Sequence, residues 1–568
     1  MGYRPAATWV LAVSLPLAAI LGAVAETPIS SDPQMDLGRR IYREGRLADG
    51  SPLRAIRSEG FILEGEQAAC VTCHRDSGMG SVEGSLELSL LVPPVTGPLL
   101  FAPARFTGTF LNKAHHWVPN EAWARALTRV AYDDQSFARA LREGLDPDGQ
   151  PLIAPMPRYE LDESSLSALA TYLRGLGPMP APGVEPDGLH LATVVTPDAP
   201  SEQGEAVIGV LRAWATASQA SGRPWALQIW ELSGPPETWS GQLEARYREQ
   251  PVFAILSGAG GAEWRPVHRF CEARRVPCIL PSLEVAPEGD PGFYSLYFSP
   301  GVTLEARLLA AHRRDESRAP GGKPPPIIQL FSDASGRRAA EALAAALGTE
   351  TQPESPRRFR PTAPAAGLDA LGEATALALW LRPAEIALLV AAMPEGPGSG
   401  PIYLSSLLAP PESLALPPAW KARVTFVSLF DDLGLQGEIA RLRLTHWLDR
   451  QGLETGGDAR PRADAYAAAY LFTRALGEIR SQEARRPRVP LSREHLLEAL
   501  EQEVNKYADG TPLVDPDSHV AFYGRMSLGP RQRMAARGGV LLRFMSPESH
   551  RLVAVTGRLV PRGANILE

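Results

Sequence analysis

Two cysteines and a histidine stand in a spacing that can hold a haem. They form the run Cys70-Val71-Thr72-Cys73-His74. Two thiols separated by two residues can each bond to one vinyl group of a single haem, and the histidine that follows becomes an axial ligand of the iron. Because the chain has only 4 Cys and 10 His in 568 residues, chance placement explains this run poorly. The motif predicts one covalently attached haem c, bonded to Cys70 and Cys73, with His74 as an iron ligand.

Paired cysteines have two other interpretations, a zinc half-site and a redox dithiol. A zinc site needs two more ligands nearby, but the remaining cysteines, Cys271 and Cys278, are far along the chain. A dithiol motif opens a helix that follows a strand, whereas residues 66–69, directly before the motif, have a helical pattern. Haem attachment is therefore favoured.

Met156 is the best candidate for the second axial ligand. Its thioether would favour Fe(II), and the flanking residues Pro155 and Pro157 stiffen the loop that presents it. Met79 is too near the motif to reach the opposite side of the haem, and Met179 lies in a linker. His115 and His116 remain an alternative, either as ligands or as loop residues that pack on a neighbouring tryptophan.

The N-terminus predicts export. Arg4 is the only charged residue before an apolar run over residues 6–25, which ends in the small residues Ala23-Val24-Ala25. Residues 1–25 are therefore predicted to be a cleaved signal peptide. An uncleaved membrane anchor is disfavoured by Pro16 and by the cleavage site. Haem c is attached after export, so both signals predict a periplasmic protein without a transmembrane anchor once the signal is cleaved.

Length and composition predict several domains. A chain of 568 residues is too long for a single core. A Pro/Gly-rich linker over 178–188 separates a haem segment, 26–177, from a larger segment, 189–568. The formal net charge of −7 and the lack of a basic stripe argue against nucleic-acid binding.

The first segment resembles the class I cytochrome c domains that serve periplasmic dehydrogenases. The resemblance covers roughly 36–177 and rests on the haem motif, on Gly38 to Tyr42, on Phe137 to Gly144, on Met156-Pro157 and on Leu169 to Arg174. It implies a small all-α cytochrome c domain in which an N-terminal and a C-terminal helix cross. The sequence departs from this family between Ser81 and Trp123, and the role of that insertion is open.

The second segment alternates short apolar runs with amphipathic helices, which predicts a mainly parallel sheet with helices on both faces. Strands are expected over 189–195, 225–232, 252–256, 277–280, 327–331, 375–381, 401–405 and 423–428. Helices are expected over 201–219, 238–248, 263–275, 336–347, 435–451 and 463–479. The size fits two such α/β halves.

This order resembles type 1 periplasmic solute-binding proteins. The resemblance rests on the stretches 255–260, 276–282, 464–470 and 491–500, and it implies a two-lobed α/β domain. Ligands of such folds bind at the carboxyl ends of strands. Ser257, Gly258 and Ser282 are therefore candidate ligand-binding residues in an anion-holding turn, with ordinary helix capping as the equal alternative.

Other residues of this segment are candidates for a disulfide or for cation binding. Cys271 and Cys278 are predicted to form a disulfide in an oxidising periplasm. Asp333, Asp431 and Asp432 follow strands and could hold a cation, although such residues are more often helix caps or solvated loop residues.

The leading hypothesis is a periplasmic mono-haem c-type cytochrome that transfers electrons, a carrier more than an enzyme. The large domain would dock a redox partner, such as a dehydrogenase or another cytochrome, or bind a small molecule. One alternative is a solute receptor or sensor in which the haem is a redox or gas-sensing element. The other is a haem enzyme with an open sixth ligand position, against which Met156 argues.

Overall fold

The computed structural model describes residues 32–561 with several gaps. The gaps are 58–59, 84–89, 105–127, 153–154, 178, 220–223, 319–323, 349–354, 367, 369–374, 431–434, 486–489, 506–522 and 524–525. The predicted signal peptide, His115, His116, Asp431 and Asp432 lie outside the described residues.

The N-terminal part packs helices around one small core. Its elements are α1 (Pro33–Glu44), β1 (Arg54–Ile56), β2 (Ile62–Glu64), η1 (Gly65–Ala68), α2 (Val71–His74), β3 (Ser81–Glu83), β4 (Leu90–Val92), α3 (Gly97–Leu100), α5 (Asp134–Glu143), β5 (Arg158–Tyr159) and α6 (Glu163–Arg174). Asp32 caps α1 by accepting a hydrogen bond from the Gln34 amide, and Gly45 ends the helix at a positive φ of 62°. Helices α1 and α6 approach closely because Gly38 has no side chain where the two backbones meet.

This part is not all-α, contrary to the prediction. Strands β2, β1 and β5 form a three-stranded antiparallel sheet, and β3 pairs with β4. Each of these strands has only two or three residues. Runs this short have no alternating pattern long enough to recognise in the sequence.

Lobe 1 is built on an almost entirely parallel sheet. Its strands are β6 (Val184–Glu185), β7 (Gly188–Val195), β8 (Trp225–Glu231), β9 (Ala254–Leu256), β10 (Ala259–Gly260), β11 (Cys278–Ile279), β12 (Ser282–Leu283) and β13 (Ser295–Leu296). The order β12-β10-β7-β9-β11-β13, with β8 also beside β7, is parallel throughout, and only β6 pairs antiparallel. The predicted parallel α/β pattern is confirmed here.

Helices cover both faces of this sheet. They are α7 (Ser201–Ser218), η3 (Pro236–Thr238), α8 (Trp239–Glu249), α9 (Arg265–Arg274), α14 (Leu435–Gln451), α15 (Arg460–Arg485) and α16 (Arg493–Asn505). Alternate residues of β7 separate the two cores, with Leu191 on the side of α7 and Val194 on the side of α8 and α9. Trp447 of α14 stacks on Trp214 of α7.

Lobe 2 repeats this plan. Its elements are α10 (Val302–Arg318), β14 (Ile327–Phe331), α11 (Ala334–Leu347), β15 (Arg357–Arg358), β16 (Ala376–Trp380), α12 (Pro383–Ala392), β17 (Ile402–Ser405), η5 (Pro411–Ser413), α13 (Pro418–Lys421), β18 (Val424–Ser428), β19 (Val540–Phe544) and β20 (Leu552–Ala554). The order β15-β14-β16-β17-β18 is parallel, and β19 and β20 extend it as an antiparallel edge.

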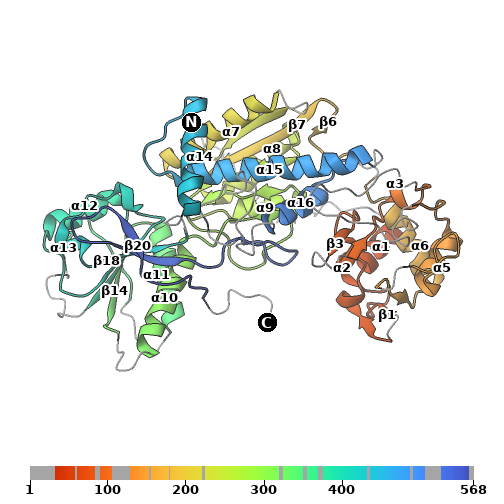
Figure 1. Ribbon diagram of the computed structural model, residues 1–568, viewed down its shortest axis with the longest axis horizontal. Coiled ribbons are helices and arrows are strands. Elements are labelled where there is room, and N and C mark those ends of the chain that lie inside the picture. Colours follow the sequence, from red (N-terminus) through yellow and green to blue (C-terminus); the bar gives the residue numbers. More distant parts are fainter. Residues whose placement is uncertain are drawn as a thin grey trace, which may run out of the picture.

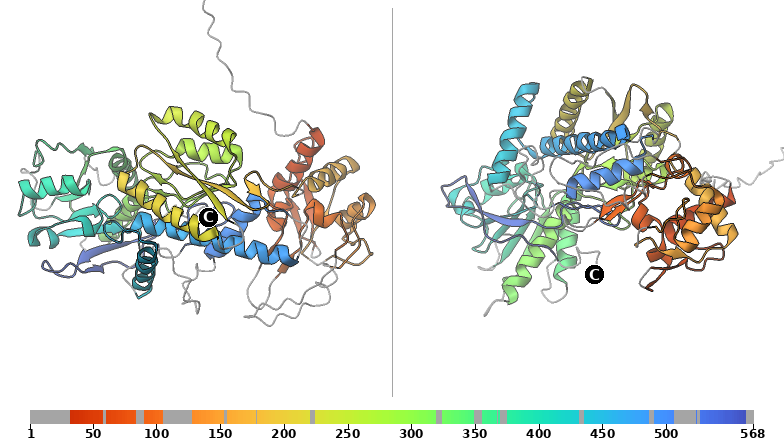
Figure 2. Two further views of the ribbon diagram at one scale, coloured as in Figure 1. Left: turned by 90° about the horizontal axis from the view of Figure 1, so that it is seen from above. Right: turned by 45° about the vertical axis from the view of Figure 1, so that its right-hand side comes forward.

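The chain passes between the lobes three times, after β13, after β18 and after α16. Lobe 2 and the N-terminal part lie at opposite ends of the molecule, with lobe 1 between them (Figure 1). The two further views show the same order (Figure 2). The predicted two-lobed α/β architecture with parallel sheets is confirmed.

The segment predicted as a linker is packed on lobe 1. Strand β6 pairs with β7, and the Ala181 amide donates to the carbonyl of Leu491. Gly183 has a φ of 84°, and a Cβ there would lie 2.1 Å from the amide nitrogen of Phe253. Met179 is 74% exposed, whereas Ala181 and Val184 of the same stretch are half-buried. The domain boundaries themselves remain a prediction.

Among the described helices, none combines the length and apolar character needed to cross a membrane.

Candidate functional site

The Cys70–His74 motif forms the single turn of helix α2, with Cys70 at its cap position. Cys70 and His74 are buried, and Cys73 is half-buried. Cys70 and Cys73 are not joined to each other in a disulfide. Burial raises the pKa of the Cys70 thiol to about 12. The motif therefore presents its thiols from one short helical turn.

The His74 ring is oriented by a backbone carbonyl. Its Nδ1 lies 2.9 Å from the oxygen of Pro93, and because a carbonyl can only accept, Nδ1 carries the proton. Burial lowers the pKa of His74 to about 4, so the ring is neutral near pH 7 with its lone pair on Nε2. Histidines that bind a metal through one ring nitrogen commonly donate the N–H of the other ring nitrogen to a carbonyl in this way.

Met156 lies in the same core as the motif. It packs, half-buried, against the cluster that includes Cys70, Tyr159 and Phe137. Met179 is exposed in the predicted linker, outside this cluster. The structure thus places Cys70 and Met156 around one core.

These residues fit a haem. A neutral histidine with Nε2 available and a thioether in the same core are the donor types that haem c uses. No group of three or more His, Cys, Asp or Glu within the described ranges could hold a metal ion by itself. A porphyrin supplies four ligands of its iron, so a haem does not need such a group. Haem attachment and the ligand roles of His74 and Met156 therefore remain predictions.

Ser257 and Gly258 form a strained turn after β9. Ser257 has a φ of 52° and Gly258 a φ of 142°, and a Cβ on Gly258 would lie 2.7 Å from the Val194 oxygen. Neither residue caps α9, whose cap position is Trp264. The Ser282 amide donates to the Gly258 oxygen at 2.9 Å, so the structure brings all three candidate residues together.

Ser282 also binds residues that the sequence did not single out as a site. Its hydroxyl donates to Asp464 of α15 at 2.7 Å, and its carbonyl accepts from Gln203 of α7 at 2.7 Å. Burial raises the pKa of Asp464 to about 7, against the opposing effect of Arg460 one turn earlier in α15. Asp464 and Gln203 are far from Ser282 in sequence and lie on helices, so no local pattern could have revealed them.

Several polar atoms in this region are buried without a hydrogen bond to any described residue. They are Ser257 Oγ, Gln203 Oε1, and Nε and Nη1 of Arg460. Ser257 is 1% exposed and Arg460 is 7% exposed. Buried polar groups are nearly always paired, so these atoms call for a partner from outside the chain, either a ligand or water.

An ion-pair network joins the two lobes beside this region. Glu284, which follows β12 of lobe 1, accepts from Arg382 at 2.8 Å and from Ser335 at 2.6 Å, both in lobe 2. Arg382 also donates to Asp333 at 2.7 Å. Asp333, a candidate for cation binding, caps α11 by accepting from the Gly336 amide. Its observed roles are those of a cap and an ion-pair partner.

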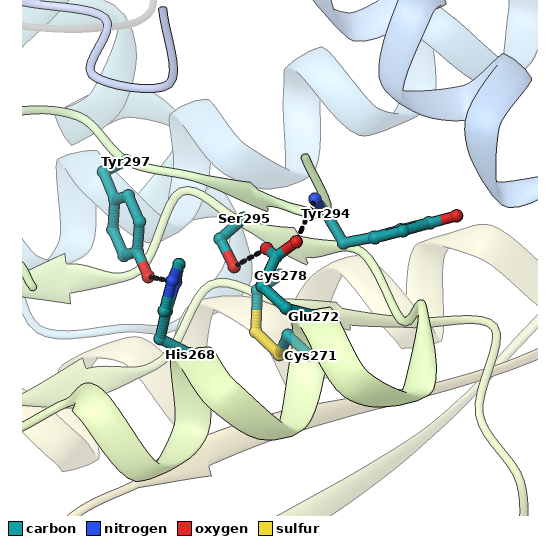
Figure 3. The surroundings of a disulfide bond; sticks show 7 residues. All are labelled: His268, Cys271, Glu272, Cys278, Tyr294, Ser295 and Tyr297. Atoms are coloured by element: carbon teal, nitrogen blue, oxygen red, sulfur yellow. Dashed lines mark hydrogen bonds between the residues drawn. A yellow bond between two sulfur atoms is a disulfide. The ribbon is translucent and has the colours of Figure 1, made fainter. Parts of the chain in front are cut away.

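A disulfide joins Cys271 to Cys278, with their Cα atoms 6.1 Å apart. It ties the end of α9 to β11 (Figure 3). Glu272, beside it, accepts from Ser295 Oγ at 2.7 Å and from the Tyr294 amide at 3.1 Å. The disulfide therefore lies within a polar network that holds β13 to α9.

The strand order and the three passages between the lobes define a two-lobed α/β protein with a largely parallel sheet in each lobe. Solved structures of periplasmic solute-binding proteins resemble the chain. A fatty acid ABC transporter substrate-binding protein from Thermomonospora curvata is 15% identical, covering 68% of this chain and 96% of its own, with a TM-score of 0.48. A branched-chain amino acid ABC transporter protein with bound valine, from Thermus thermophilus, is 11% identical, covering 66% and 97%, with a TM-score of 0.45.

A leucine-binding protein from Thermotoga maritima is 14% identical, covering 66% of this chain and 99% of its own, with a TM-score of 0.44. Identities this low bear on the fold alone, and TM-scores below 0.5 add no argument of their own, so the fold assignment rests on the strand order. No family model matches the chain, and no curated protein matches it.

The prediction that this protein is chiefly an electron-transferring cytochrome is wrong. About two thirds of the chain align with solute-binding proteins of ABC transporters, and this finding agrees better with the solute-receptor alternative than with the cytochrome. These comparisons also give no support to cytochrome, haem or iron as descriptions of the protein, or to a redox partner. The Cys70–His74 motif is the strongest local signal in the sequence, so it dominated the prediction of function. It belongs, however, to the smaller part of the structure.

Proposed function

We propose that this protein is a periplasmic solute receptor that binds a small polar molecule at the carboxyl ends of the lobe 1 strands. The buried polar atoms of Ser257, Gln203 and Arg460 that lack a hydrogen bond to any described residue carry this proposal, although Arg460 Nε lies 3.8 Å from the Asp458 carboxylate. They gather where parallel α/β sheets bind ligands. The two-lobed architecture supports it, because the Glu284–Arg382 pair brings lobe 2 to the same edge.

The chemistry of these atoms indicates the class of solute. Arg460 and the Ser257 hydroxyl are donors, and they match a carboxylate or carbonyl group. Gln203 Oε1 and Asp464 are acceptors for an amine, amide or hydroxyl. A small solute with both kinds of group, such as an amino acid or an amide, fits best. The valine bound in the Thermus thermophilus protein and the name of the leucine-binding protein agree with this class, whereas the fatty acid named for the Thermomonospora curvata protein does not.

Export is part of the proposal. The apolar N-terminal run and the disulfide between Cys271 and Cys278 both suit an oxidising periplasm. A covalent haem c on Cys70 and Cys73 remains a proposal for the N-terminal part. The support for it is the Nδ1 bond that orients His74. When bound, the haem would serve the receptor as a redox or gas-sensing element.

A thermal-shift panel of amino acids, amides, alcohols and small carboxylates tests the receptor. A true ligand at 100 times its Kd stabilises the folded state by about 2.7 kcal/mol and raises the Tm with concentration. Ser257→Ala should bind it roughly 3- to 10-fold more weakly, because one hydrogen bond is lost.

The Ser257 hydroxyl has no partner among the described residues, so the variant should fold as well as wild type. Ser240→Ala, at an exposed position of α8, should bind like wild type. A panel without any stabiliser, or equal binding by Ser257→Ala, would contradict the proposal.

A further inference from the structure

The turn that follows the Cys70–His74 motif lies against helix α16 of lobe 1. Ser77 of this turn is buried, and its amide donates to Glu498 Oε1 at 2.9 Å. Its hydroxyl bonds to the other oxygen of the same carboxyl group. The Ser77 amide thus has its hydrogen-bond partner in the other half of the molecule, 421 residues away in sequence.

A second contact passes through Glu501, one helical turn further along α16. Arg75 donates to Glu501 Oε2 at 3.0 Å, and Arg533 binds the other carboxylate oxygen. The Arg533 side chain is fully buried and also binds the carbonyl of Phe293, just before β13. The residue after His74 is therefore connected, through Glu501 and Arg533, to the segment that leads into β13 of the lobe 1 sheet.

Helix α16 is itself fastened to lobe 1 at its first residue. The Arg493 guanidinium donates to the carbonyls of Phe253 at 3.1 Å, Arg274 at 3.2 Å and Arg275 at 3.1 Å. These carbonyls precede β9 and end α9. The helix therefore moves with the lobe 1 sheet. Figures 1 and 2 show the N-terminal part beside α16 and away from lobe 2.

We propose that the turn 75–78 and helix α16 form a permanent docking interface that couples the N-terminal part to lobe 1. Buried polar pairs of this kind fix the register of an interface. The chain segment between the two parts keeps their local concentration high, so that even a modest interface stays formed. A change in lobe 1 then acts on the residues beside His74. This coupling does not depend on the proposed solute.

Hydrogen exchange of the full-length protein, followed on peptides over 75–80, tests the docking. In wild type these amides should exchange roughly 100-fold or more slowly than in an unstructured peptide. Glu498→Ala removes the acceptor of the Ser77 amide, and exchange there should rise roughly 5- to 100-fold. Glu498→Gln retains an acceptor and a donor and should restore most of the protection.

Arg531→Ala is the matched control. Arg531 pairs with Glu66 across the same two parts, but these side chains are 73% and 72% exposed. Exposed pairs of this kind contribute little, so exchange over 75–80 should stay within about twofold of wild type.

Arg493→Lys tests the coupling, since the hydrogen bonds of the Arg493 guanidinium within the described part of the chain go to lobe 1 and to Pro182. Loosening α16 in this way should raise exchange over 75–80, while peptides from the lobe 2 sheet keep their protection. Fast exchange over 75–80 in wild type would overturn the docking. Unchanged exchange there in Arg493→Lys would overturn the coupling.

Discussion

The His74 side chain has the tautomer and the neutral charge that an iron ligand, the role predicted by its motif, would need. The Pro93 carbonyl holds the proton on Nδ1, and burial keeps the ring neutral. If a haem is attached, acid–acetone extraction of the exported protein should leave it on the polypeptide.

Met156→Ala should then remove the far-red sulfur-to-iron band of the ferric protein and lower its reduction potential. Met179→Ala, at an exposed position, should change neither property. Haem that extracts freely would refute attachment, and an unchanged Met156→Ala spectrum would refute the ligand role of Met156.

Glu305 of α10 predicts a pH dependence of stability. The side chain is fully buried and accepts bonds from Ser406 at 2.8 Å and from the Leu407 amide at 3.1 Å. Burial raises its pKa from 4.5 to about 7. Between pH 4.5 and about 7, the Glu305 carboxyl group is therefore protonated in the folded protein but ionised in the unfolded chain. The stability contributed by Glu305 consequently falls as the pH rises from about 4.5 to 7, and it is lost above that range.

Replacing this carboxyl group should flatten that dependence. The melting temperature of Glu305→Gln should decrease less steeply with rising pH, across this range, than that of wild type. Glu202→Gln, at an exposed position in the first turn of α7, should retain the wild-type slope. If the melting temperatures of wild type and Glu305→Gln changed equally with pH, the raised pKa of Glu305 would be contradicted.

At the scale of elements, glycine decides how closely two helices of the N-terminal part can pack. A Cβ on Gly38 of α1 would lie 2.1 Å from the Ala168 oxygen of α6. Gly38→Ala should therefore push the helices apart and destabilise this part by about 1–3 kcal/mol.

Gly241→Ala is the control, because no atom lies within 4 Å of the position of its Cβ in α8. That change should stabilise the protein by about 0.5–1 kcal/mol. Thermal melts that show equal effects at the two positions would contradict the close crossing of α1 and α6.

At the scale of the whole molecule, the Glu284–Arg382 ion pair is one of the contacts that join the two lobes. Arg382→Ala would leave Glu284, whose side chain is 1% exposed, without its cation. We expect a loss of about 2–5 kcal/mol in stability and a larger radius of gyration in solution scattering as the lobes separate.

Arg337→Ala removes an exposed pair with Glu341 within α11 and should cost at most about 1 kcal/mol without changing the radius. An unchanged radius in Arg382→Ala would show that this pair does not hold the lobes together.

The sequence by itself determined most of the regular elements of the large domain. The expected strand over 327–331 is β14 to the residue, and the expected helix over 435–451 is α14. Long elements carry a pattern that repeats within the element, so local residues can predict them, although the helix α10 over 302–318 was not expected. Several two- and three-residue strands, among them β12 with Ser282, carry no such pattern and were not expected, although β9 and β11 lie within the expected strands 252–256 and 277–280.

Only the tertiary structure decided what surrounds the candidate residues. Ser257 and Ser282 were recognised as candidates, but Asp464, Gln203 and Arg460 reach the same region from helices far away in sequence. Likewise, no local signal connects Ser77 to Glu498 across 421 residues. Contacts between distant segments depend on how whole elements pack. For this reason the motif predicts haem chemistry at Cys70–His74, whereas the contacts between that motif and the rest of the protein became visible only in the folded chain.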